Sequence, residues 1–176
     1  MRAALLCCLA AACAPAAKTV RPVPDGPLPE VVEDTVTYDV TGSTRGELRA
    51  ALDRLGPDDD SGRHDAYTKW FVRWFYDYDR DDTSCRLTNV RATVEVKTTL
   101  PTWTNETAEL GPAWQQYLAA LRTHEKGHAQ NAVDAGRFIL AALKAQPASS
   151  DCDSAAVAAN AKANEELELA RAKDRE

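Results

Sequence analysis

The stretch that decides the fold is residues 113–146, AWQQYLAALRTHEKGHAQNAVDAGRFILAALKAQ. Apolar and small residues recur in it at spacings of three and four, which is typical of one face of an amphipathic α-helix. Pro112 suits the first turn of such a helix, and Pro147 follows its end. We therefore expect one long helix that packs along the rest of the domain.

The middle of this helix carries an H-E-x-x-H motif, formed by His124, Glu125 and His128. Residues four apart on a helix lie one turn apart on nearly the same face, so the two imidazoles can reach one metal ion. A carboxylate beside that ion can take a proton from an attacking water and deliver it to a leaving amine. The motif predicts a zinc site with His124 and His128 as ligands and Glu125 as catalytic base.

Two residues of the motif interrupt the apolar row of the helix. The row comprises Trp114, Leu118, Leu121, Glu125, His128, Ala132, Ala135 and Ile139. A buried carboxylate or imidazole without partners is strongly unfavourable, so we expect either a metal or a complete hydrogen-bond network. The alternative interpretations are a pair of surface histidines and a hydrogen-bonded His and Glu in the core. The chain has three histidines and two lie in the motif, which favours the metal site.

The beginning of the 176-residue chain has the pattern of an export signal. One basic residue, Arg2, precedes a short apolar run over residues 3–14, which is too brief to span a bilayer. We expect residues 1–17 to be a signal peptide, cleaved after Ala16 or Ala17. Residues 10–13 also resemble a lipoprotein processing site, in which Cys13 would carry a lipid. Periplasmic, lipid-anchored and secreted destinations all stay open.

The remaining chain reads as a linker followed by one domain. Residues 18–30 contain four prolines and predict an extended linker. Residues 31–176 predict a single zincin-like domain. A net charge of -6 argues against nucleic acid as a partner, because phosphate binding needs clustered Lys and Arg. The expected membrane contact is limited to a lipid at the N-terminus.

Two of the five cysteines, Cys85 and Cys152, lie outside the leader. In an exported chain the simplest expectation is that they form a disulfide. Zinc ligation by either cysteine is the rival interpretation, although neither belongs to a C-x-x-C pair.

The other elements predict an α+β fold, in which a small antiparallel sheet packs against two long helices. Alternation predicts strands over residues 31–41, 67–78 and 85–99, the last two forming a hairpin. Thr44 and Glu47 form a capping-box pattern that opens a helix ending at Gly56. Asp153 and Ser154 can cap the second long helix, expected over residues 155–176.

The chain resembles a bacterial family of predicted secreted zinc-dependent proteases, known as domain of unknown function 922, over about residues 36–175. The resemblance rests on these features: the helix ending from Glu47 to Gly56 and Pro57, Trp70 and Trp74 in one strand, Cys85, the Leu100, Pro101 and Trp103 run, Trp114, the His124 to His128 motif, and Cys152. It implies a metal-dependent peptidase with His124 and His128 as ligands. Family members usually continue into a Tyr-Asp segment followed by Thr-x-His-Gly, which supplies a further histidine, whereas this sequence stops at Glu176, short of that segment.

Catalytic zinc generally takes three protein ligands, so a third is expected. Four residues of the sequence could supply it: Glu168, Glu165, His64 and Asp134. Glu168 aligns with polar residues at helical spacing, whereas Asp134 would lie on a different face of an uninterrupted helix. For each of the four, a solvated surface residue is the competing interpretation.

These observations predict an exported zinc metallopeptidase that hydrolyses a peptide or protein substrate in the cell envelope. The competing prediction is an envelope binding or scaffold protein that keeps the fold but lacks a complete site.

Overall fold

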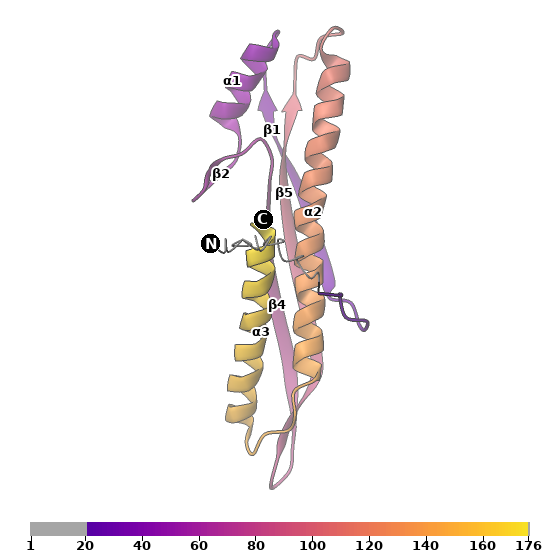
Figure 1. Cartoon of the computed structure of the whole chain (residues 1–176), viewed down its shortest axis with the longest axis vertical. Helices are drawn as coiled ribbons and strands as arrows, with labels where there is room; N and C mark the ends of the chain where they lie inside the picture. The colour runs from indigo at the N-terminus through magenta and orange to yellow at the C-terminus, as the bar shows by residue number, and fades with distance from the viewer. Residues whose placement is uncertain (1–20, 176) are drawn as a thin grey trace, which may run out of the picture.

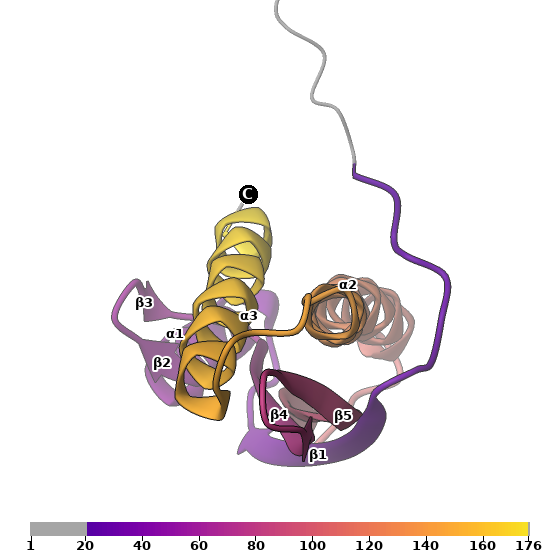
Figure 2. The same ribbon diagram turned by 90° about the horizontal axis from the view of Figure 1, so that it is seen from below.

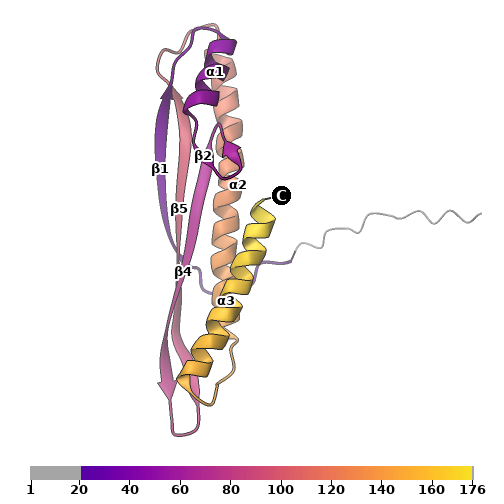
Figure 3. The same cartoon turned by 90° about the vertical axis from the view of Figure 1, so that its left-hand side faces the viewer.

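The computed structural model describes residues 21–175, so the expected signal peptide and Cys13 lie outside it. It confirms the α+β class, with three strands in one layer and three helices on one face of them (Figure 1, Figure 3). The elements in chain order are β1 (Glu30–Val40), α1 (Arg45–Leu55), β2 (Asp58–Asp59), β3 (Gly62–Arg63), β4 (Tyr67–Arg80), β5 (Cys85–Trp103), α2 (Gly111–Lys144) and α3 (Cys152–Asp174). Within the described residues, no helix is both long and apolar enough to cross a membrane.

The main sheet is mixed rather than antiparallel, which corrects the prediction. Its strand order is β1-β5-β4, with β4 and β5 antiparallel and β1 parallel to β5. Alternation of apolar residues shows which face of a strand is buried, but it does not encode the direction of the neighbouring strand. The expected hairpin of β4 and β5 is confirmed.

Strand β5 also runs further than predicted, through Pro101 to Trp103. The last residue of β5 that pairs with β4 is Thr99, opposite Tyr67, whereas pairing with β1 continues to Trp103. At Pro101 the strand therefore has a partner on one side only. A residue without an N–H group is tolerated at such a position, as it is on an edge strand.

Helix α2 covers the sheet as the long amphipathic pattern predicts (Figure 2). The core between them contains these buried residues: Val72, Ala92, Val94, Val96, Ala132, Ala135, Ile139, Leu140 and Leu143. At Gly136 the helix comes so close to its neighbours that an added Cβ would lie 2.7 Å from the Val94 side chain. The sequence stripe and the close approach together determine how α2 lies on the sheet.

Helix α3 packs beside α2 through small side chains, as its thin apolar stripe predicts. Ala155, Ala159 and Ala163 follow each other at spacings of four and are buried, and Leu167 continues their row. Residues at this spacing share one helix face, so the alanines allow close approach to α2.

The short helix α1 and its neighbours form a second apolar cluster at the start of α2. Thr44 and Glu47 make the predicted capping box. The buried members of the cluster are Val40, Leu48, Ala51, Leu52, Trp103 and Trp114. Next to it, Arg49 pairs with Asp65, which also accepts a hydrogen bond from Tyr117 and whose backbone carbonyl accepts one from Tyr38 at 2.7 Å.

The stretch before β1 lies along α2 rather than apart from it. Arg137 of α2 donates a hydrogen bond to the Pro24 carbonyl at 3.0 Å, and Pro29 is buried beside Gly136. Residues 21–29 contain no helix or strand. These proline-rich residues therefore reach β1 across the helical layer.

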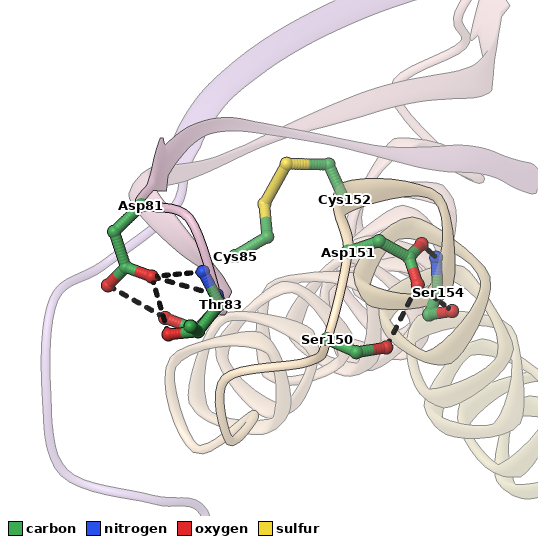
Figure 4. Close-up of a disulfide and its surroundings, with 8 residues drawn as sticks. Asp81, Thr83, Cys85, Ser150, Asp151, Cys152 and Ser154 are labelled. Atoms are coloured by element: carbon green, nitrogen blue, oxygen red, sulfur yellow. Dashed lines mark hydrogen bonds between the residues drawn. A yellow bond between two sulfur atoms is a disulfide. The ribbon is translucent and has the colours of Figure 1, made fainter.

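Cys85 and Cys152 form a disulfide, which confirms the predicted pairing and leaves neither sulfur free to bind zinc. The bond joins the first residue of β5 to the first residue of α3 (Figure 4). Asp151 caps the same helix end by accepting a hydrogen bond from the Ser154 backbone at 2.8 Å.

Reducing this disulfide is expected to destabilise the domain. The bond joins residues 67 positions apart, and closing such a loop stabilises a fold by about 4 kcal/mol in the chain-entropy account. Urea unfolding with and without dithiothreitol measures the difference. A Cys85→Ala, Cys152→Ala double variant is the control, and its midpoint should not respond to dithiothreitol.

The Asp65 network should make stability depend on pH. Hydrogen bonding from the Arg49 guanidinium holds the pKa of Asp65 below its ordinary value, so its stabilising effect is present above about pH 4 and is lost as the pH falls further. Asp65→Asn should therefore destabilise the protein at pH 7 by on the order of 2 kcal/mol. The difference from the parent in urea unfolding should shrink toward pH 3, whereas a constant difference would contradict the network's role.

Candidate metal centre

The two motif histidines face each other on one flank of α2. The Nε2 atoms of His124 and His128 are 3.1 Å apart, and their rings are nearly perpendicular, at 86°. Two nitrogen ligands of a tetrahedral zinc ion lie roughly 3.3 Å apart, since each bond is about 2.0–2.1 Å long. The two nitrogens are at hydrogen-bond distance from each other, and their spacing is also close to that of two ligands of one metal ion.

Asp174, in the last turn of α3, holds His128 in this orientation. Its carboxylate contacts His128 Nδ1 at 2.9 Å and accepts hydrogen bonds from Asn131 and from the Trp70 indole, each at 2.8 Å. When Nδ1 carries the proton toward a carboxylate, Nε2 keeps a lone pair for a metal. The contact between Asp174 and His128 is therefore the kind of support that metal-binding histidines have in proteins.

The electrostatics of Asp174 favour this role. Burial raises the pKa of the Asp174 carboxyl, but the hydrogen bonds from Asn131, Trp70 and His128 together outweigh burial and leave the pKa below its ordinary value. The carboxylate therefore stays ionised at neutral pH and can keep the His128 ring in one orientation.

The four candidates for a third ligand do not join the histidine pair. Each has a partner of its own: Glu165 with Lys162, Glu168 with Arg171, His64 with Asp59, and Asp134 with Gln130. In the part of the chain that the structure describes, no group of three or more His, Cys, Asp or Glu side chains is placed to hold a metal. Residues 21–175 therefore offer two facing histidines and the Asp174 carboxylate that contacts one of them.

Glu125 is almost fully buried, with 4% of its surface exposed. Its Oε2 atom is buried and has no hydrogen-bond partner, while its backbone carbonyl accepts from Thr68 of β4 at 3.4 Å. A buried carboxylate oxygen without a partner is unfavourable, so this atom suits a water, a ligand donor or a nearby cation. Among residues 21–175 no histidine contacts the Glu125 carboxylate, so a hydrogen-bonded His–Glu pair does not describe this arrangement, whereas His124 is exposed and His128 is partly buried, as a surface pair would be.

The Glu125 side chain lines a groove of about 600 Å³ between α2 and β1. Neither His124 nor His128 belongs to the lining of that groove. The histidines lie instead toward β4 and the end of α3, where Trp70 and Asp174 are. The residues of the motif therefore lie on two flanks of α2: the histidines face β4 and α3, and Glu125 lines the groove.

Sequence reasoning missed Asp174, Trp70 and Asn131 as parts of this site. Asn131 lies three residues after His128, a helical spacing that could have indicated it. Trp70 belongs to the predicted aromatic strand, but its alternation indicates burial and not a hydrogen-bond partner. Asp174 is far from the motif in sequence, and no pattern links the two.

Together these features define an α+β domain with a paired-histidine site on its longest helix. The chain matches the family described as bacterial protein of unknown function (DUF922) over residues 35–176 and belongs to that family. No curated protein and no solved structure is significantly similar to it.

Removing the supporting carboxylate should weaken metal binding. Asp174→Ala frees the His128 ring, and loss of such a partner typically lowers metal affinity 10–100-fold. Competition with a fluorescent zinc chelator measures this. Glu168→Ala, the same truncation on the same helix at an acid paired with Arg171, is the control and should bind zinc like the parent.

Proposed function

We propose that the protein is a zinc-dependent metallopeptidase that hydrolyses peptide bonds with Glu125 as general base. The observation that carries the proposal is the facing pair of Nε2 atoms, 3.1 Å apart, on a helix whose neighbouring carboxylate has a buried oxygen without a partner. The chain's membership of the family is consistent with the proposal, although the description of the family states no activity.

In this mechanism His124 and His128 would hold the ion, and Asp174 orients His128. Zinc, held there, would supply polarisation of the substrate carbonyl and a lowered pKa of a water molecule. Glu125 takes a proton from the water as its oxygen bonds to the carbonyl carbon, and then passes that proton to the nitrogen as the C–N bond breaks. Its burial keeps competing water away and strengthens its interaction with nearby positive charge.

We also propose that the protein acts outside the cytoplasm, on a peptide or protein substrate in the cell envelope. The leader pattern of residues 1–17 and the Cys85–Cys152 disulfide support this, because disulfides persist in oxidising compartments. Lipidation at Cys13 and soluble export both agree with these features.

A second candidate function is a binding or scaffold protein of the envelope without catalytic activity. Two observations favour it. Residues 21–175 supply no third His, Cys, Asp or Glu ligand. In addition, neither histidine belongs to the groove that Glu125 lines. On this proposal the histidine pair binds metal weakly or holds α2 and α3 together.

Two substitutions separate these functions. Glu125→Gln should keep zinc and lower peptide turnover by at least about a hundredfold, because it removes the base but no ligand. His124→Ala should lose zinc as well as turnover. Elemental analysis of the dialysed protein measures the metal, and cleavage of a quenched fluorescent peptide library measures turnover.

Zinc near one equivalent per chain after dialysis would support the enzyme. Zinc that dialyses away from the parent as readily as from His124→Ala would support the scaffold instead. Unchanged turnover in Glu125→Gln would refute the proposed base.

A further inference from the structure

The groove between α2 and β1 is long enough for a short stretch of extended chain. Its β1 wall carries Glu33, Asp34, Thr35 and Thr37, and its α2 wall extends from Trp114 to Ala129. At about 3.3 Å per strand residue the first wall is about 13 Å long, and at 1.5 Å per helix residue the second is about 22 Å. An extended segment of about four to six residues spans such a length.

β1 leaves one backbone edge without a strand partner among residues 21–175, because it is the end strand of the order β1-β5-β4. All six residues from Glu30 to Thr35 are exposed. Free N–H and C=O groups along such an edge pair readily with another extended segment. The edge therefore supplies affinity for polypeptide backbone next to the groove.

The charge of β1 indicates which segment fits. The strand contains Glu30, Glu33, Asp34 and Asp39 and no basic residue. Pairing two copies of β1 would bring acids against acids, which disfavours a second copy of this chain. On the α2 side the lining adds Arg122 and Lys126, but with Glu33, Asp34, Glu106 and Glu125 its acids outnumber its bases, so a basic segment is favoured over an acidic one.

Glu125 adds a specific contact inside the groove. Its side chain lines the groove, and its buried Oε2 has no partner within the protein. A hydrogen-bond donor from a bound segment would satisfy this oxygen. The unpaired carboxylate and the free edge are independent observations that point to the same ligand.

We propose that the groove binds an extended polypeptide segment of basic character, which adds to β1 as a further strand and donates a hydrogen bond to Glu125. The groove contains neither histidine, so this proposal does not depend on metal binding or on the peptidase proposal.

The test uses protein dialysed against EDTA, so that turnover does not interfere, and two fluorescein-labelled probes, a short alternating Lys-Val peptide and its Glu-Val counterpart. Fluorescence anisotropy should show binding of the Lys-Val peptide and at least about tenfold weaker binding of the Glu-Val peptide. Hydrogen exchange should slow at β1 amides when the Lys-Val peptide binds, because these amides acquire a strand partner.

Thr35→Trp fills the groove and should weaken binding of the Lys-Val peptide at least about tenfold. Val32→Trp is the matched control, since position 32 lies on the opposite face of the same strand and should bind like the parent. Thr35→Arg provides a second, smaller change that repels a basic segment, and circular dichroism confirms that each variant is folded.

Binding that survives both Thr35 substitutions, or that falls equally in Val32→Trp, would overturn the proposal. Failure of the Lys-Val peptide to bind, or binding without slower exchange in β1, would overturn it as well. A concentration-dependent dimer in sedimentation, lost in Thr35→Trp, would replace the peptide with a second copy of the chain. Zinc content and turnover of Glu125→Gln are separate measurements, so either proposal can fail alone.

Discussion

The close packing of α2 on the β4–β5 hairpin is the constraint on which the other features depend. Ile139 and Val94 are fully buried in this contact, and Gly136 leaves no room for a side chain against Val94. Interiors packed at such density adopt one arrangement, because each displaced methyl group meets a neighbour. The position of α2 on the sheet then determines which neighbouring elements the side chains on its two flanks face.

The two flanks of α2 have different neighbours and therefore different chemistry. On one flank His124 and His128 face the end of α3, where Asp174 orients the nearer ring. On the other flank a groove separates the helix from an exposed edge strand, and the buried carboxylate of Glu125 belongs to its lining. The histidine pair and the groove thus lie on different flanks of one helix.

Helix α3 has little apolar surface, yet it is held at both ends. Its first residue, Cys152, is bonded to the start of β5, and Asp174 in its last turn bonds to α2 and β4. The alanine row between these ends contributes close contact but few buried methylene groups. Covalent and polar links therefore position the Asp174 carboxylate, which contacts the histidine pair.

The sequence by itself determined the elements, because their signals are local: the helical row of α2, the alternation of β4 and β5, and the capping box at Thr44 and Glu47 depend on neighbours within a few residues. The motif spacing likewise determined that His124 and His128 share a helix face. Only the tertiary structure decided that β1 runs parallel to β5, that Asp174 reaches His128, and that Glu125 lines a groove. These relations join residues far apart in the chain, and a single sequence carries no periodic signal for them, since their energy comes from contacts that exist only after the layers pack together.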